Sequence, residues 1–371
     1  MLAKDRAKKG VDFFGMTMYT QGSKVRMPAI PADHALPMNR QTRCETLGKK
    51  ERFPGQMSAI QIPQEFHLTD QAVVHPGDCL EFLKTIPNGT AQLIVTSPPY
   101  NIGKEYETRL RLSQYLDQQQ AVIEECFRIL WTKGSICWQV GNYVDHGAII
   151  PLDTILYPIF AKLGMKMRNR IVWHFEHGLH CSRRFSGRYE TIIWFTKTDD
   201  YKFNLDPVRV RQKYPGKKYF KGPKAGQYSC NPLGKNPADV WDIPNVKCNH
   251  VEKTIHPCQF PVELVERLVL SMTDKGDWVV DPFLGVGTAV VAAVRHARRG
   301  AGAETIPEYV EIALERIRQA MEGRLRTRPM DRPIYDPKDA GKSLTLIPWS
   351  HEPPKEKQPR LFENTATYGK R

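Results

Sequence analysis

Hydrophobic residues between positions 66 and 320 fall into two alternating kinds of segment. Short apolar runs such as 91–96, 135–140 and 278–281 have the length and composition typical of buried strands. Between such runs lie longer segments, such as 113–131, in which apolar residues recur every three or four positions, as on one face of a helix. This alternation predicts an α/β fold with a doubly wound, mostly parallel sheet. In such folds, ligands bind at the carboxyl ends of the strands.

The same pattern predicts the other elements of this region. Strands are expected at 170–173, 191–195 and 302–304, and helices at 152–163, 261–272, 288–298 and 307–320. Pro158 lies inside the first of these helices and is expected to kink or interrupt it, because proline lacks a backbone donor. Residues 1–65 and 321–371 show no sustained period and are predicted to be irregular extensions.

The basic residues gather outside the alternating segments. The whole formal net charge of +14 lies in residues 1–65, 199–255 and 321–371, whereas 66–198 and 256–320 are together neutral. We therefore divide the chain into a basic N-terminal extension, a first half of the α/β domain, a basic insertion, a second half and a basic tail. A neutral framework with basic appendages indicates a polyanion partner such as nucleic acid, although a solvated basic surface is the simpler alternative.

Membrane insertion and secretion are not indicated. No run of eighteen apolar residues occurs, and the first residues lack the apolar segment of a secretory signal, so a cytoplasmic protein is expected. The eight cysteines include no Cys-x-x-Cys pair and are expected to be reduced thiols. Cys230, Cys248, His250, His256 and Cys258 cluster in the sequence, but their spacings fit no common zinc pattern, and no metal is predicted.

A glycine-containing turn joins the strand at 278–281 to the helix that follows it. Gly285 and Gly287 would let the backbone turn sharply and approach a ligand closely. Glu304 stands 19 positions after Gly285, at the end of the next strand, where a carboxylate can accept both ribose hydroxyls of an adenosine. The Gly-x-Gly-Thr pattern modestly favours S-adenosylmethionine over a dinucleotide. An ordinary strand–helix turn is the alternative for the glycines alone.

A second candidate site is Ser97-Pro98-Pro99-Tyr100, which directly follows the strand at 91–96. Consecutive prolines hold the chain extended and remove two backbone donors. The groups left are acceptors, the Ser97 hydroxyl and the carbonyls around the prolines, beside an aromatic ring. Such a site suits an aromatic amine, which donates two hydrogen bonds and stacks on the ring. Acceptors aimed at its N–H groups would stabilise the positive charge that develops when the nitrogen attacks a methyl group. A structural Pro-Pro turn is the alternative.

Taken together, the two motifs resemble those of the bacterial N4-cytosine and N6-adenine DNA amino-methyltransferases. The motifs are Ser97-Pro98-Pro99-Tyr100 and the segment 281–288, Asp-Pro-Phe-x-Gly-x-Gly-Thr. The resemblance covers about residues 70–320. The motif order, with the Pro-Pro motif first, is similar to the circularly permuted beta group. The resemblance implies a Rossmann-like methyltransferase fold, S-adenosylmethionine as cofactor and double-stranded DNA as substrate, with the target base flipped out. It also implies a bacterial or archaeal cytoplasmic enzyme, monomeric or homodimeric, that a cognate restriction endonuclease accompanies in some systems.

Roles for individual residues follow from this resemblance. The catalytic residues would be Ser97, Pro98, Pro99 and Tyr100, acting without a covalent enzyme intermediate. The cofactor-binding residues would be Asp78, Cys79, Asp281, Phe283, Gly285, Gly287, Thr288 and Glu304. Among these, Asp78 would contact the adenine and Glu304 the ribose. The segment 256–261 would flank the methionine end of the cofactor, although Phe260 stands where family members often have lysine.

The basic insertion at 199–255 occupies the place of the target-recognition region in such enzymes. Residues 208–224 hold seven basic side chains and no acidic one, interleaved with Tyr214, Tyr219 and Phe220. Basic side chains can position phosphates, and the side chains of arginine, glutamine and asparagine can contact base edges. The predicted DNA-binding residues are Lys104, Arg183, Arg184, Arg209, Arg211, Lys213, Lys217, Lys218 and Lys221. For each residue alone, a solvated surface position is an equally good interpretation.

The target base and three rival functions stay open at this point. Serine at the first motif position is more usual for N4-cytosine enzymes and aspartate for N6-adenine enzymes, so Ser97 slightly favours cytosine. An amide methyltransferase with Asn-Pro-Pro-Tyr would have the glycine site first. A non-catalytic DNA-binding protein on the same frame would not need Ser97, Tyr100 and Glu304 intact. A nicotinamide-dependent oxidoreductase would make the Pro-Pro motif a coincidence.

Overall fold

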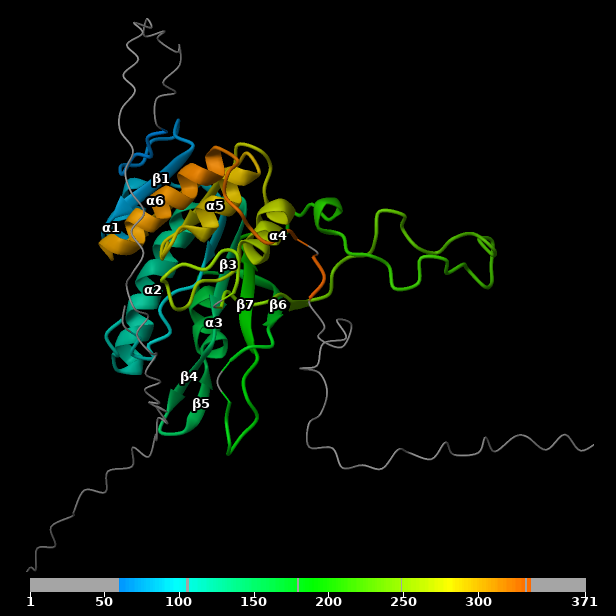
Figure 1. Ribbon diagram of the computed structural model, residues 1–371, viewed down its shortest axis with the longest axis horizontal. Helices are drawn as coiled ribbons and strands as arrows, with labels where there is room; N and C mark the ends of the chain where they lie inside the picture. Colours follow the sequence, from blue (N-terminus) through cyan, green and yellow to red (C-terminus); the bar gives the residue numbers. More distant parts are fainter. Residues whose placement is uncertain (1–59, 105–106, 179, 248, 331, 335–371) are drawn as a thin grey trace, which may run out of the picture. The chain divides into compact units, whose positions relative to one another are not determined.

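A computed structural model describes residues 60–104, 107–178, 180–247, 249–330 and 332–334 (Figure 1). The predictions for residues 1–59 and 335–371 lie outside this part. The described strands are β1 (Ala72–Pro76), β2 (Ala91–Thr96), β3 (Leu130–Val140), β4 (Asn142–Asp145), β5 (Ala148–Pro151), β6 (Lys166–His174), β7 (Tyr189–Thr196), β8 (Val240–Asp242), β9 (Trp278–Asp281) and β10 (Arg299–Glu304). The helices are α1 (Cys79–Thr85), α2 (Leu112–Ile129), α3 (Leu152–Lys162), α4 (Val262–Met272), α5 (Thr288–Arg295) and α6 (Pro307–Met321), with a 3₁₀ turn at Asp206–Val208.

The predicted sheet is confirmed. Its strand order is β1-β10-β9-β2-β3-β7-β6-β8, and β4 and β5 form a separate hairpin. Only β7 runs against its neighbours β3 and β6 among these eight strands, and the other pairings are parallel. Strands β9 and β2 lie side by side although most of the α/β domain separates them in sequence. This pairing brings the end of the Pro-Pro strand next to the end of the glycine strand.

Helices cover both faces of the sheet, as Figure 1 shows. Apolar residues of α4, α5 and α6 form one core with the sheet, and those of α1, α2 and α3 form a second. Ile94 packs in the second core while its neighbours Leu93 and Val95 pack in the first. Burial on both faces explains why the strands read as continuous apolar runs. No helix in the part of the chain that the structure describes is long and apolar enough to cross a membrane.

Gly302 on β10 shows how tightly the second half of the α/β domain is packed. A Cβ atom there would meet the Asp281 carbonyl oxygen at 2.6 Å and Leu284 Cδ1 at 2.8 Å. We expect Gly302→Ala to lower the free energy of unfolding by about 1–3 kcal/mol, because the backbone must shift to admit the methyl group. Urea unfolding monitored by circular dichroism measures this change. Gly216→Ala is the control, because a Cβ there has no neighbour within 4 Å. Equal stability of the two variants would contradict the prediction.

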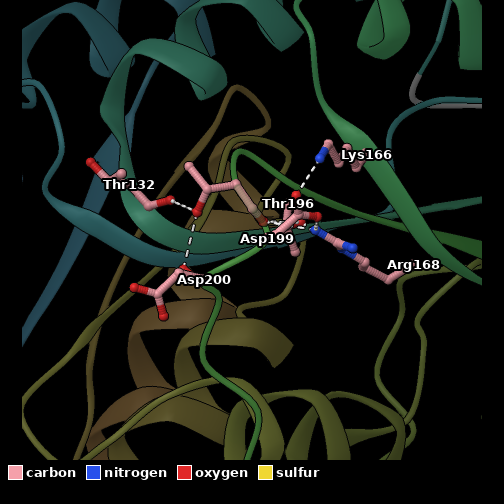
Figure 2. A network of polar contacts seen from close by, with 7 residues as sticks. Thr132, Lys166, Arg168, Thr196, Asp199 and Asp200 are labelled. Atoms are coloured by element: carbon pink, nitrogen blue, oxygen red, sulfur yellow. Dashed lines mark hydrogen bonds and ion pairs between the residues drawn. The ribbon is translucent and has the colours of Figure 1, made fainter.

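A polar network fixes the chain where it leaves β7 (Figure 2). Lys166 and Arg168 of β6 both pair with Asp199, with 2.8 Å between Arg168 Nη2 and Asp199 Oδ1. The Thr198 hydroxyl donates to the Thr132 carbonyl oxygen at 3.2 Å. These contacts join β6, β7 and β3 at the end of the sheet where the parallel strands begin, opposite their carboxyl ends. The basic insertion therefore starts from a fixed point.

The insertion predicted at 199–255 is not uniform. Its later part contains β8, which pairs with β6 and is an integral strand of the main sheet. Between these anchored ends, residues 209–235 project from the domain as a long loop, seen in green in Figure 1. Two isolated bridges, Val210 with Lys235 and Lys218 with Tyr228, make this loop an irregular hairpin. We call residues 209–235 the basic hairpin.

Candidate active site

A cavity lies where the carboxyl ends of β1, β2, β9 and β10 meet. Nine of the twelve predicted catalytic and cofactor residues line it: Ser97, Pro98, Pro99, Tyr100, Asp78, Cys79, Phe283, Gly285 and Glu304. The two motifs, far apart in sequence, therefore share one cavity. The segment before α4 also reaches it through His256 and Cys258.

Three predicted cofactor residues, Asp281, Gly287 and Thr288, do not line the cavity. Gly287 has φ = 80° and begins α5, and a Cβ there would meet Ala313 Cβ of α6 at 3.1 Å. Thr288 is buried and accepts a hydrogen bond from Arg316 at 3.2 Å. Gly287 thus permits close packing of two helices, and Thr288 faces the protein interior, so the structure places both behind the wall of the cavity.

Asp281 joins the two motifs from behind the cavity. It is 1% exposed, and its Oδ1 accepts from the Thr96 hydroxyl at 2.5 Å and from the Phe283 backbone N–H at 3.0 Å. Its Oδ2 has no hydrogen-bond partner among the described residues. Burial raises the pKa of Asp281 to about 7, although the Thr96 and Phe283 hydrogen bonds oppose this shift. Asp281 therefore holds Thr96, which precedes the cavity-lining Ser97, and Phe283, which itself lines the cavity.

The carboxylates of Glu304 and Asp78 line the cavity at the carboxyl ends of β10 and β1. Glu304 Oε2 accepts from the Gly285 N–H at 2.9 Å and Oε1 from the Ile306 N–H at 2.9 Å. Asp78 caps α1, and its Oδ1 accepts from the backbone N–H groups of Leu80 and Glu81 at 2.8 and 3.1 Å. Each carboxylate thus keeps acceptor capacity while the backbone holds it in place. Burial raises the pKa of Glu304, and its backbone hydrogen bonds act against this rise.

A second hollow adjoins the first and shares Asp78, Cys79, Pro99 and Phe283 with it. Tyr115 and Gln119 of α2 line this hollow, and each is 3% exposed. The Tyr115 hydroxyl and Gln119 Oε1 have no hydrogen-bond partner among the described residues. Buried polar atoms without partners indicate a ligand or water. The sequence analysis did not single out Tyr115 or Gln119, because both belong to the amphipathic pattern of α2 and carry no motif.

Polar contacts around Tyr100 link the Pro-Pro motif to two residues that the sequence did not single out. The Tyr100 hydroxyl lies 3.1 Å from Ser97 Oγ and donates to Glu190 Oε2 at 3.0 Å. The Gln139 amide donates to the Tyr100 hydroxyl at 2.9 Å and also to Glu190. Glu190 is the second residue of β7 and Gln139 the penultimate residue of β3, so two strand ends hold one side chain. Gln139 and Glu190 are single polar residues in otherwise apolar strands and belong to no motif, so the sequence analysis could not identify them.

Backbone features hold the Tyr100 ring and the loop after it. A Cβ on Gly141 would meet the Tyr100 ring at 3.0 Å, so the ring lies directly over this glycine. Asn101 adopts a left-handed backbone (φ = 59°), and its side chain exchanges hydrogen bonds with the Leu110 backbone. Glu107 accepts from the Asn101 and Ile102 N–H groups at 2.8 Å. These contacts brace the loop that carries Lys104.

In the segment before α4, His256 lines the cavity and its ring lies 4.7 Å from that of Tyr309. Burial, with the Lys253 and Arg316 charges, lowers the pKa of His256 to about 4. The imidazole is therefore neutral at neutral pH. Phe260 is 9% exposed and belongs to the apolar core, so it stabilises this segment from beneath.

The predicted DNA-binding residues occupy different surroundings. Exposed side chains include Lys104, Arg183, Arg184, Arg211, Lys213, Lys217, Lys218 and Lys221. Arg209 differs, because its guanidinium binds Asp206 at 2.7 Å and the Gly234 carbonyl oxygen at 3.2 Å, which braces the base of the basic hairpin. Arg183 and Arg184 precede Phe185, which is fully exposed. Their loop joins β6 to β7 at the same edge of the sheet as Ser97.

Comparison with known proteins identifies the family. The DNA methylase family model (N6_N4_Mtase) matches residues 91–315. The Type II methyltransferase M.BglII of Bacillus subtilis is 52% identical over 255 residues, which cover 68% of this chain and 71% of that protein. The Type II methyltransferase M.ScaI of Streptomyces caespitosus is 36% identical and covers 69% and 84%.

A solved structure confirms the fold. The cytosine-N4-specific PvuII DNA methyltransferase aligns with a TM-score of 0.55 at 22% identity, over 71% of this chain and 95% of that one. The sequence match extends across both halves of the α/β domain, and the cavity at the strand ends joins both motifs. The chain therefore belongs to the DNA methylase family of N4 and N6 amino-methyltransferases, and its methyl donor is S-adenosylmethionine.

Proposed function

We propose that this protein methylates the N4 amine of cytosine at a specific sequence in duplex DNA. One observation carries this proposal: the acceptors of the Pro-Pro motif and the carboxylates Glu304 and Asp78 line the same cavity. The first group suits an amine, and the second suits an adenosine. A Type II modification role is supported by the relatives named M.BglII and M.ScaI.

The cavity residues fit S-adenosylmethionine. Glu304 would accept from the ribose hydroxyls and Asp78 from the adenine amine, with Tyr115 and Gln119 at the adjoining hollow. Gly285, at φ = 53°, lies close to His256, where a Cβ would meet Nε2 at 3.4 Å, so any side chain there would narrow the cavity. When bound, the cofactor supplies an electrophilic methyl group on a positively charged sulfur.

The chain's own residues then act on the target amine. Ser97 Oγ and the Pro98 carbonyl accept its two N–H groups, while the Tyr100 ring stacks on the base. Because both prolines lack N–H donors, nothing from this segment competes with the amine for those acceptors. The acceptors also stabilise the positive charge that develops on nitrogen. Asp281, bonded to Thr96, keeps the motif next to the cofactor cavity.

Cytosine is the preferred base because Ser97 occupies the first motif position, where serine is more usual in N4-cytosine enzymes. The cytosine-N4-specific PvuII enzyme has the same fold. Adenine N6 is the second candidate, because the DNA adenine methyltransferase YhdJ of Escherichia coli is 31% identical over 264 residues. Both bases present an exocyclic amine to the same pair of acceptors.

Transfer of a labelled methyl group tests the function, and mass spectrometry of the digested DNA identifies the base. We expect N4-methylcytosine in DNA incubated with protein and cofactor, at one short sequence that methylation-sensitive sequencing reveals. N6-methyladenine would select the second candidate. No incorporation into any DNA, with intact cofactor binding, would overturn the proposal.

The basic hairpin is proposed to contact the phosphate backbone. Lys217, Lys218 and Lys221 are exposed there, and Lys218 and Lys221 lie over the rings of Tyr228 and Phe220. Replacing the three lysines with alanine is expected to weaken DNA binding and to reduce the slope of log K against log salt by about 0.9 for each phosphate that is no longer neutralised. Fluorescence anisotropy across a salt series measures both quantities.

A matched control removes the same kind of charge elsewhere. Lys84 and Lys162 are exposed in the last turns of α1 and α3, at the ends remote from the cavity. Their double alanine variant is expected to keep the original salt slope. If the hairpin variant and the double variant changed DNA affinity and the salt slope equally, the effect would be one of general charge, with no specific contact by the hairpin.

A further inference from the structure

The hydrogen bonds around Tyr100 form a chain whose direction decides what Ser97 offers to a substrate. A tyrosine hydroxyl has one proton, and that of Tyr100 is donated to Glu190 Oε2 at 3.0 Å. The Gln139 amide donates to the same hydroxyl oxygen at 2.9 Å. With its proton in use, Tyr100 can only accept from Ser97, whose Oγ lies 3.1 Å away. The Ser97 lone pairs are then left for a ligand.

We propose that Glu190 is a positioning residue: through Tyr100 it keeps the Ser97 hydroxyl an acceptor for the target amine. The inference rests on the proposed function, because it concerns the amine bound at Ser97. An ionised Glu190 has no proton and fixes the direction from Ser97 through Tyr100 to itself. A protonated Glu190 can donate to Tyr100, which can then donate to Ser97. In that reversed chain, the Ser97 proton turns toward the amine and opposes its binding.

The surroundings of Glu190 allow both charge states near neutral pH. Withdrawal from water raises its pKa to about 7, against the hydrogen bonds from Tyr100 and Gln139 and the charge of Lys247, which lower it. Cys258, which lines the cavity, also faces Tyr100, and its charge acts to raise the pKa of the Tyr100 hydroxyl. Above pH 7 the carboxylate predominates and the chain points in the productive direction. Activity is therefore expected to rise with pH through this value.

Two variants test the chain of hydrogen bonds from Ser97 through Tyr100 to Glu190. Glu190→Gln removes the ionisable group at nearly constant shape, and Tyr100→Phe keeps the ring over Gly141 but removes the link. We expect each to lower kcat by about 10- to 100-fold, as for groups that orient a reacting residue. Each should also lose the rise of kcat through pH 7. The double variant should be no worse than either single one, because both changes break the same chain.

The control is Glu308→Gln, on the exposed first turn of α6, which should leave kcat and its pH profile unchanged. Asp281 also has a pKa of about 7, raised by burial. A pH-dependent rise that persists in Glu190→Gln would assign the titration to Asp281 and overturn the proposal. Full kcat in Glu190→Gln, or losses that multiply in the double variant, would overturn it as well.

A readout without substrate separates this inference from the proposed function. Infrared titration of the cofactor-free protein should show a carboxyl group with a pKa near 7 that is missing in Glu190→Gln. In Tyr100→Phe the pKa of Glu190 should rise further, because the variant lacks a hydrogen bond that favours the carboxylate. An unchanged pKa would show that Tyr100 and Glu190 are not linked. Absence of DNA methylation with the expected infrared shifts would instead count against the proposed function alone.

Discussion

Glu304→Ala is expected to weaken S-adenosylmethionine binding by about 100-fold, since the loss of hydrogen bonds to a charged acceptor costs about 1.5–3 kcal/mol. The carboxylate lines the cavity at the end of β10, and backbone N–H groups of Gly285 and Ile306 hold it there. The carboxylate would therefore need no rearrangement to accept from the ribose hydroxyls. Isothermal titration calorimetry with the cofactor measures the change in Kd.

The variant also leaves two backbone donors without their acceptor, so its fold must be checked. Glu304→Gln is the matched comparison, because the amide keeps the size of the side chain and one oxygen acceptor. We expect Glu304→Gln to bind more weakly than the native protein but better than Glu304→Ala, with similar urea unfolding curves. A cofactor Kd within about threefold of native for Glu304→Ala would show that Glu304 does not hold the ribose.

Ser97→Ala is expected to lower kcat for DNA methylation by about 100- to 1000-fold, the effect of removing one hydrogen-bonding group that stabilises developing charge. The alanine methyl group cannot accept from the amine, while the prolines keep the backbone of the motif in place. Cofactor affinity should stay nearly unchanged, because the adenosine-binding carboxylates lie on the other strands. Single-turnover transfer of labelled methyl groups measures the rate.

Comparison of the two variants separates the halves of the cavity. Glu304→Ala should act mainly on cofactor binding, and Ser97→Ala on the rate with both ligands bound. Ser182→Ala, an exposed serine on the β6–β7 loop, serves as the control and should change neither. A normal rate for Ser97→Ala would leave the Pro98 carbonyl as the only acceptor of the motif and would refute the proposed role of the hydroxyl.

Most of the α/β region could be predicted from the pattern of residues. The predicted strands at 91–96 and 278–281 coincide with β2 and β9, and the predicted helix at 113–131 is α2, Leu112–Ile129. Strands buried on both faces must be apolar throughout, and this requirement is visible without a structure. The pattern did not predict β1, α1, the β4–β5 hairpin or β8, which are short and carry weak periodic signals.

The sequence by itself determined the class of fold, the two motifs, the family and the basic character of the insertion, because each depends on local composition or on residues close together in the chain. Only the tertiary structure decided which of these residues meet. The β2–β9 pairing placed Thr96 against Asp281 and brought Ser97 to the cofactor cavity. The pairing of β3 with β7 brought Gln139 and Glu190 within hydrogen-bond distance of the Tyr100 hydroxyl. Contacts across strand ends depend on sheet order, which no local pattern encodes.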